Sequence, residues 1–240
     1  HYTLSMVYNV VNMIILISIA AFIFTILGGL FALKFKDKLH LILGFSAGAV
    51  IGVAFFDLLP ESIELAGGDE KIITVVAIGF VLYLILDRFI IQHSHDSRGA
   101  IGAGSLAMHS FLDGVGIGLA FQVSNAVGLV VTVAVLVHDF TDGINTVNMI
   151  LKNDGEKKKA IKWLVNDAIA PVIGIASTML FTLSESSLGI VLALFTGFFL
   201  YIGASDLLPE SHHNHPTIWT TILTIAGMVV IYIAITLAHV

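Results

Sequence analysis

The sequence contains no cysteine and very little charge. Without cysteine there are no disulfides and no thiolate ligands, so any bound metal ion must be held by nitrogen and oxygen atoms. Only 12% of the 240 residues are charged, whereas soluble domains carry roughly a quarter. The composition is instead 57% hydrophobic, with a mean hydropathy of +0.98. These values exclude an ordinary soluble domain, and no segment is typical of nucleic-acid recognition, so we expect no nucleic-acid partner.

The hydrophobic residues gather in long runs of the length needed to cross about 30 Å of hydrocarbon. Segments that cross a bilayer must be helices or strands of a closed barrel, and these runs are too continuously apolar for barrel strands. We therefore expect an all-α integral membrane protein that forms one domain over residues 1–240, surrounded by the lipid bilayer. The eight expected helices cover residues of about 8–33, 40–64, 71–92, 100–123, 126–151, 160–183, 187–211 and 217–239.

The Lys and Arg residues predict how the chain is oriented. Ten of the eleven lie in or beside the connections between expected helices 1–2, 3–4 and 5–6, and Lys71 alone lies on the opposite side. By the positive-inside rule these connections face the cytoplasm. We expect a multi-pass protein of the plasma or inner membrane with both termini outside. The sequence starts at His1 rather than Met, so we expect it to begin inside the natural chain or at an artificial junction, and we predict nothing about a signal peptide.

One six-residue sequence occurs twice. Asp57–Ser62 and Asp206–Ser211 both read Asp-Leu-Leu-Pro-Glu-Ser, near the ends of expected helices 2 and 7. The first copy then lies on the outer side and the second on the inner side, as in inverted-topology repeats that flank a transport site. We expect helices 1–3 and 6–8 to form such a repeat around helices 4 and 5. The alternative is a shared helix-ending signal in which Pro and acidic residues act as punctuation.

Two His-x-x-x-Asp pairs are expected near the middle of neighbouring helices. His109 and Asp113 form one pair, and His138 and Asp142 form the other. Residues four apart lie on one helix face, and a short connection makes the two helices antiparallel neighbours. Each Asp at mid-membrane costs about 2.5–3.5 kcal/mol on insertion scales unless it is neutralised, and Asp139 adds a third. A divalent cation such as zinc would neutralise the carboxylates and use the imidazoles as ligands. The alternative is a His–Asp cluster that only packs the helices.

Further polar residues extend the candidate site. Asn145 and Asn148 continue the face that carries Asp142, and either can supply a carbonyl ligand or bond between helices. Asp167, one turn before Pro171, is either a further ligand or a hydrated residue near the inner end of its helix. Loop histidines on the predicted inner side either capture metal at the mouth of a pathway or are simply solvated. These are His93, His95, His212, His213 and His215.

At these residues the chain resembles the ZIP family of metal transporters over nearly its whole length. His109-Ser-x-x-Asp113-Gly is close to the family's pattern on helix 4. His138-Asp-x-x-Asp142-Gly is similar to the family's His-Glu-x-Pro-Glu-Gly on helix 5, with both Glu shortened to Asp and Pro replaced by Thr141. The shorter side chains predict a metal preference that differs from the family average.

The resemblance implies a site for two metal ions and a pathway on either side of it. The family's Glu before the helix 6 Pro is replaced here by Ala170, so the second position depends on whether Asp167 substitutes. An outer entrance is implied near Asp57 and Glu61, and an inner release area near Asp206 and Glu210. The first metal position would be formed by His109, Asp113, His138 and Asp142, and the second by Ser110, Asp113, Asp139 and Asp142.

The function predicted from residues and resemblance together is uptake of a divalent metal into the cytoplasm by alternating access. Zn²⁺ is the expected substrate, with Fe²⁺, Mn²⁺ and Cd²⁺ as alternatives, and the ion is cargo rather than a cofactor of an enzyme. The competing prediction is an intramembrane zinc-dependent hydrolase, which needs an open coordination position for water. A metal sensor or scaffold is disfavoured because the sequence has no room for a sensory domain. Both a monomer and a homodimer are compatible with the sequence.

Overall fold

The computed structural model describes residues 2–34, 39–92, 98–153, 156–213 and 217–238. Within them, eight helical spans are long and apolar enough to cross a membrane, in agreement with the expected count. The long helices are α1 (Tyr2–Lys34), α2 (Leu39–Val53), α4 (Ile72–Gln92), α5 (Arg98–Val123), α6 (Asn125–Asn153), α7 (Lys157–Thr178), α8 (Glu185–Tyr201) and α10 (Ile218–Ala238).

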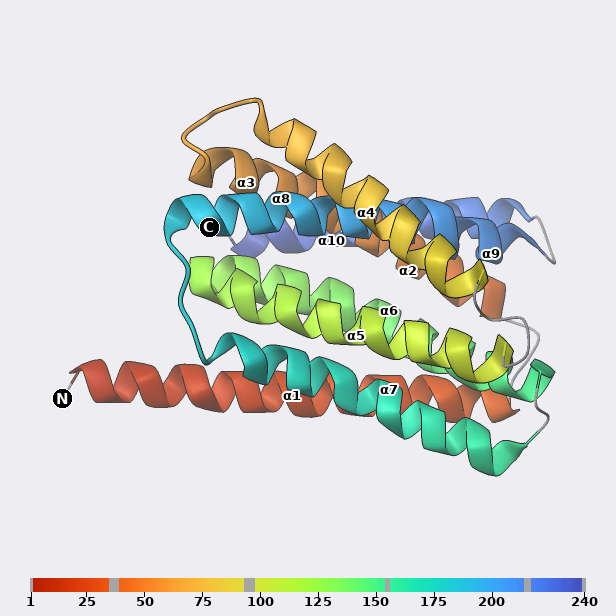
Figure 1. The fold of residues 1–240 in the computed structure, drawn as a ribbon. Helices are drawn as coiled ribbons and strands as arrows, with labels where there is room; N and C mark the ends of the chain where they lie inside the picture. The colour runs from red at the N-terminus through yellow and green to blue at the C-terminus, as the bar shows by residue number, and fades with distance from the viewer. Residues whose placement is uncertain (1, 35–38, 93–97, 154–155, 214–216, 239–240) are drawn as a thin grey trace.

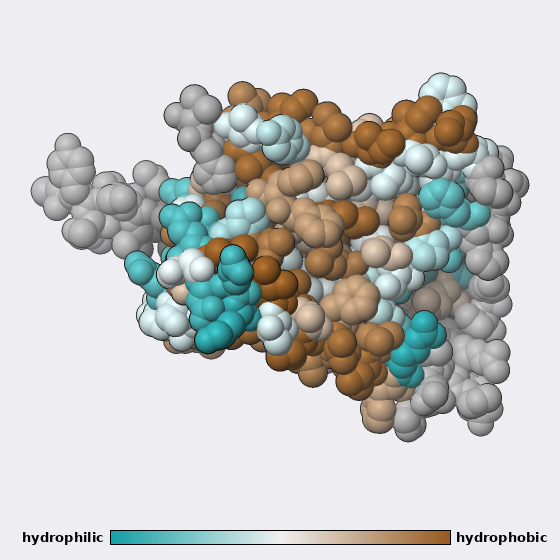
Figure 2. Space-filling model, turned by 90° about the horizontal axis from the view of Figure 1, so that it is seen from above, coloured by the Kyte–Doolittle hydropathy of each residue, from teal (hydrophilic) through white to brown (hydrophobic). Residues whose placement is uncertain are grey.

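The surface matches a protein that is surrounded by lipid. Exposed side chains along α4 and α10 are large and apolar, among them Ile85, Phe89 and Ile233. Figure 2 shows brown, hydrophobic residues over much of the middle of one face and teal, hydrophilic residues toward its two ends. The protein is therefore a multi-pass membrane protein, since an apolar belt between polar ends is what a bilayer requires.

The helices form two groups that meet along α5 and α6. In Figure 1, α5 and α6 lie in a middle layer, with α1 and α7 below them and α2, α4, α8 and α10 above them. The most extensive contacts pair α1 with α6, α5 with α7 and α5 with α6 on one side, and α2 with α10 and α4 with α8 on the other. Contacts between the two sides are less extensive. We call α1, α5, α6 and α7 the lower group, and α2, α4, α8 and α10, with the short elements attached to them, the upper group.

Glycines explain why packing is closest within each group. A Cβ at Gly114 would lie 2.1 Å from the carbonyl oxygen of Pro171, and one at Gly174 would lie 2.2 Å from that of Phe111, so α5 and α7 touch backbone to backbone. Four helix pairs, α1 with α6, α5 with α7, α2 with α10 and α4 with α8, have two glycines of this kind, one on each helix. Between the groups, Gly116 meets the Phe195 ring instead of a backbone. The four pairs are Gly28–Gly143, Gly114–Gly174, Gly48–Gly227 and Gly79–Gly197.

Both copies of the six-residue repeat have the same local structure. The helix widens into a π-helical turn at η1 (Ala54–Leu58) and at η2 (Ile202–Leu207), then continues as α3 (Leu59–Leu65) and α9 (Leu208–His213). The widening has a physical cause, because Pro60 and Pro209 have no N–H to donate and their rings would clash with the carbonyl four residues earlier in an α-helix. The repeat therefore does not end the helix where it occurs. In Figure 1, α3 and α9 lie at opposite ends of the molecule.

The sixth expected helix ends earlier than predicted. The range 160–183 is wrong at its C-terminal end, since α7 stops at Thr178 and residues 179–184 are not helical. Gln122 of α5 satisfies the released backbone: its amide nitrogen donates to the carbonyls of Thr178 and Phe181 at 3.1 and 2.9 Å. Its oxygen accepts the N–H of Leu183 at 3.1 Å. Ser184 then caps α8 by accepting the N–H of Ser187. The local sequence could not reveal these hydrogen bonds, because the side chain that makes them lies on another helix.

Candidate metal site

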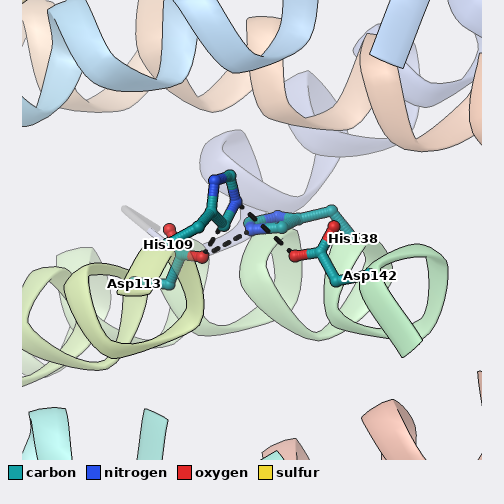
Figure 3. A group of neighbouring side chains, drawn as sticks. All are labelled: His109, Asp113, His138 and Asp142. Atoms are coloured by element: carbon teal, nitrogen blue, oxygen red, sulfur yellow. Dashed lines mark hydrogen bonds and ion pairs between the residues drawn. The ribbon is translucent and has the colours of Figure 1, made fainter. Parts of the chain in front are cut away.

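The two His-x-x-x-Asp pairs meet between α5 and α6. Only Ser124 separates these helices, which makes them neighbours, and the spacing of four residues places each His above its Asp on one face. One ligand atom from each of His109, Asp113, His138 and Asp142 lies within 4.8 Å of the other three. Figure 3 shows the four side chains converging on the side of α5 and α6 that faces the upper group. All four are buried, and the most exposed, His109, is only 6% exposed.

The distances within this group of four are those of ligands around one position. The Oδ2 atom of Asp113 lies 3.2 Å from Nε2 of His109 and 3.2 Å from Nε2 of His138. The Oδ2 atom of Asp142 lies 3.5 Å from Nε2 of His109. Neither this Asp142 oxygen nor Nε2 of His109 has a hydrogen-bond partner among the described residues. Buried polar atoms without partners are costly, and here they face one another, so a cation between them would satisfy both.

Each histidine is held by its second ring nitrogen. Nδ1 of His138 lies 3.0 Å from the carbonyl oxygen of Ala134, one turn earlier on α6. Because a carbonyl only accepts, Nδ1 carries the proton and Nε2 is the nitrogen available to a metal ion. Nδ1 of His109 is instead hydrogen-bonded to the hydroxyl of Tyr83 from α4. With two imidazole nitrogens and two carboxylate oxygens, the group offers the donor set of a tetrahedral zinc site.

Ser110 and Asp167 form a second polar pair close to the first. The hydroxyl of Ser110 donates to Oδ1 of Asp167 at 2.7 Å, and that of Thr146 donates to Oδ2 at 2.8 Å. The alternative that Asp167 is hydrated at the end of its helix is wrong, since the residue is fully buried. Its carboxylate is placed beside α5 and α6 by α7, which packs closely on α5 through the glycine contacts described above.

Two further predicted ligands lie outside the group of four. Asp139 is fully buried, and neither of its carboxylate oxygens has a hydrogen-bond partner among the described residues. Asn145 is partly buried on the same helix, one turn beyond Asp142. The structure thus brings together the ligands of the first implied metal position, and the second implied position remains a prediction.

The acidic residues of the predicted pathway lie in the two copies of the repeated sequence, Asp57 and Glu61 in η1 and α3, and Asp206 and Glu210 in η2 and α9. Asp57 is buried in η1 and its Oδ2 has no hydrogen-bond partner among the described residues, while Glu61 is partly buried in α3. Asp206 is partly buried in η2, and Glu210 is exposed in α9. His212 forms a hydrogen bond within its own helix α9, where its Nδ1 lies 2.9 Å from the carbonyl oxygen of Leu208. His93, His95 and His215 lie outside the described residues, as does the side chain of His213.

Aromatic residues of the upper group cover the site, and none of them was among the residues predicted from the sequence. The ring of Phe199 on α8 packs edge-on against His138, with centroids 5.9 Å apart. Tyr83 packs in the same way against His109 at 5.8 Å. The only signal for Tyr83 was its position four residues before Asp87, which places two polar groups on one face of an otherwise apolar helix.

The fold and the site together define a class: a multi-pass membrane protein with a buried His/Asp group suited to a divalent metal. Comparison with known proteins gives the family. The model of the ZIP zinc transporter family matches residues 93–234, more than half of the chain, and the chain belongs to this family.

Several curated zinc transporters are similar to the chain. Zinc transporter ZIP13 of Pongo abelii is 24% identical over 212 residues, covering 79% of this chain and 64% of that protein. Zinc transporter foi of Drosophila melanogaster is 27% identical over 121 residues, covering 50% and 17%. Human zinc transporter ZIP4 is 30% identical over 103 residues, covering 43% and 16%. The chain thus spans less than two thirds of the length of these relatives.

Proposed function

We propose that this protein moves a divalent metal ion, with Zn²⁺ as the main substrate, across the membrane into the cytoplasm. The observation that carries the proposal is the buried group of His109, Asp113, His138 and Asp142, which lies between two separately packed groups of helices. Membership in the ZIP zinc transporter family supports the same function.

The geometry favours transport over the alternative of an intramembrane hydrolase. A catalytic zinc usually has three protein ligands and keeps one position open for water. Here four protein ligands converge within 4.8 Å, and all of them are buried. A closed set of four ligands favours capture and release of the ion itself, and the relatives are named as zinc transporters.

The proposed cargo is one ion at a time in the arrangement seen here. A second ion would need Ser110, Asp139 and Asp167 to turn toward Asp113 and Asp142. Ser110 already donates to Asp167, whose other oxygen accepts from Thr146. Ala170 offers no carboxylate where the resemblance implies one. Loading a second position would therefore require breaking bonds that hold α5, α6 and α7 together.

Movement between the two helix groups supplies the alternating access in this proposal. All four ligands belong to the lower group, whereas Asp57 and Asp206 belong to the upper group, in η1 and η2. These two turns continue into α3 and α9, which lie at opposite ends of the molecule (Figure 1). Sliding the lower group against the upper group would bring the ligands toward one acidic residue and then the other. Within each group the helices pack backbone to backbone, whereas between the groups the Phe195 ring packs on Gly116. This difference supports a sliding movement of one group against the other.

The proposal also fixes orientation and allows a homodimer. We place both termini on the extracytoplasmic side of the plasma or inner membrane, because the Lys- and Arg-rich connections belong on the cytoplasmic side. Because one chain supplies all four ligands, a homodimer would contain two complete sites.

The experiment that tests this function is metal flux into sealed proteoliposomes, with Zn²⁺, Mn²⁺ and Fe²⁺ compared at a fixed pH on both sides. We expect saturable Zn²⁺ flux that His138→Ala abolishes, because the substitution removes one of four ligands. His40→Ala is the matched control, since His40 lies at the start of the span formed by α2 and is not one of the four ligands. Correct folding is checked by size-exclusion chromatography of both variants.

Two results would contradict the proposal. One is wild-type protein that gives no metal flux beyond empty liposomes. The other is a His138→Ala variant that transports zinc as well as the wild type does.

A further inference from the structure

Tyr83 is a buried tyrosine whose hydroxyl is bonded to the candidate metal site from outside the ligand set. It lies on α4 and is 7% exposed. Its hydroxyl is hydrogen-bonded to Nδ1 of His109, the nitrogen that faces away from Asp113 and Asp142. The contact joins α4 of the upper group to α5 of the lower group.

The position of this hydroxyl is fixed independently of the metal site. The Tyr83 ring packs against the rings of Phe198 and Tyr201 on α8, each with centroids 5.4 Å apart. Tyr201 in turn donates its own hydroxyl to Asp87 of α4 at 2.9 Å. The position of Tyr83 is therefore set by residues of the upper group. Its hydroxyl contacts the part of α5 that faces α4, which in this structure is His109.

The two histidines differ in what orients them. Nδ1 of His138 is bonded to a carbonyl of its own helix, so this ring keeps its orientation wherever α6 goes. Nδ1 of His109 is hydrogen-bonded to Tyr83 of the upper group, so movement of the lower group would separate His109 from Tyr83. A group bonded to the second nitrogen of a ligating histidine fixes the rotation of the ring and strengthens metal binding.

We propose that Tyr83 is a positioning residue that aims Nε2 of His109 into the group of four, and that it does so only while α4 faces α5. This inference rests on the proposed function. When the groups slide, His109 loses the hydroxyl, its ring turns more freely, and affinity for the metal falls. The Tyr83–His109 bond thereby links the position of the lower group to the strength of metal binding, with tight binding in this arrangement and weaker binding in the other.

Tyr83→Phe tests the inference, because it removes the hydroxyl and keeps the ring that packs on Phe198 and Tyr201. Tyr201→Phe is the matched control: the same atom is removed from the same aromatic cluster, but its bond to Asp87 stays within the upper group. Zn²⁺ affinity of the purified full chain is measured by competition with a chromophoric chelator. The visible absorption of bound Co²⁺ reports the geometry of the ligands, and thermal unfolding reports folding.

We expect Tyr83→Phe to weaken zinc binding by about 10- to 100-fold and to change the Co²⁺ spectrum. Tyr201→Phe should keep the affinity within about twofold of the wild type, because the hydroxyl that it removes bonds to Asp87 and not to a metal ligand, while the ring that packs on Tyr83 is kept. In proteoliposomes Tyr83→Phe should raise KM without lowering the maximal rate, because it weakens binding and leaves the passage intact.

The outcomes separate this inference from the function on which it rests. Wild-type affinity and spectrum in Tyr83→Phe overturn the inference alone, provided that His138→Ala abolishes binding. Equal weakening by Tyr83→Phe and Tyr201→Phe also overturns it, because the tyrosines would then serve only the packing of the upper group. Wild-type protein that binds no zinc overturns the proposed function and this inference together.

Discussion

Among the described residues, Asp139 is the buried carboxylate that lacks a hydrogen-bond partner at both of its oxygens. It is next to His138 in the sequence. A carboxylate buried in this way costs folding energy, and the insertion cost of an Asp at mid-membrane is about 2.5–3.5 kcal/mol. A group that weakens the fold and yet lies beside the ligands is typical of a functional site.

Asp139→Asn is expected to stabilise the metal-free protein by about 1–2 kcal/mol, because an amide costs less to bury than a charged carboxylate. If Asp139 contributes to metal binding, zinc should then raise the melting temperature of the variant less than that of the wild type. Thermal unfolding with and without Zn²⁺ measures both effects.

Asp69→Asn is the control for this substitution, since Asp69 is exposed in the loop before α4. Loss of stability in the metal-free Asp139→Asn protein would contradict the prediction, because it would mean that the carboxylate stabilises the fold.

Single residues also show how far the sequence predicts the site. The His–Asp pairs could be predicted, because residues four apart on a helix are neighbours whatever the rest of the fold does. The bonds of Asp167 and Tyr83 could not, since their partners Ser110 and His109 are 57 and 26 residues away in the sequence. Only the packing of α7 and α4 against α5 brings them into contact.

At the level of the helices, glycine determines which pairs pack most closely. Gly114 and Gly143 directly follow the two aspartates of the site, and each faces away from the metal position onto a neighbouring backbone. Gly143 meets the Thr25 carbonyl oxygen of α1, where a Cβ would lie at 2.0 Å. The residue after each ligand thus attaches the ligand-bearing helix to the rest of the lower group.

Gly114→Ala is expected to destabilise the protein by about 1–3 kcal/mol, because the added methyl group would push α5 and α7 apart. The loss is measured as a lower melting temperature in detergent. Gly104→Ala is the control on the same helix pair: its Cβ would lie 3.7 Å from the Trp163 ring, which is ordinary contact. This control should match or exceed wild-type stability, since Ala favours helix over Gly. Equal melting temperatures for the two variants would show that the close approach of α5 and α7 is not needed.

The two π-helical turns are a second feature at this level. Both copies of the repeated sequence widen the helix before a proline. That the copies belong to an inverted repeat of helices 1–3 and 6–8 remains a prediction.

For the whole molecule, the division into two groups is the feature with most consequence for transport. Side-chain hydrogen bonds that link the groups include Ser46 to the Val137 carbonyl at 2.9 Å and Tyr83 to His109. The proposed sliding movement would exchange such bonds and would keep the backbone contacts through glycine pairs within each group.

Cross-linking tests this division, and the absence of cysteine from the sequence gives a clean background. Gly116→Cys with Phe195→Cys spans the two groups, and the second substitution removes the ring that a side chain at 116 would meet. We expect a short bis-methanethiosulfonate reagent, which joins the two cysteines through disulfide bonds, to stop zinc flux in this variant. A reducing agent should restore the flux, because it cleaves these disulfides. Flux is measured in proteoliposomes before and after each treatment.

Gly52→Cys with Ile231→Cys is the matched pair within the upper group, where the two Cβ positions lie 3.3 Å apart. Cross-linking this pair should leave flux unchanged. If the pair between the groups is cross-linked and zinc flux continues, the sliding movement is wrong.

The sequence by itself determined that the chain crosses the membrane eight times and that two His–Asp pairs face each other near its middle. Hydrophobic run length and helical spacing are local properties, so they could be predicted without knowing which helices touch. The tertiary structure alone decided that Asp167 is buried against Ser110 and Thr146, that α7 stops at Thr178, and that Tyr83 holds His109 from another group of helices. Each of these depends on contacts between helices distant in the sequence, and in a uniformly apolar chain such contacts are set by glycine positions and side-chain fit rather than by any local pattern.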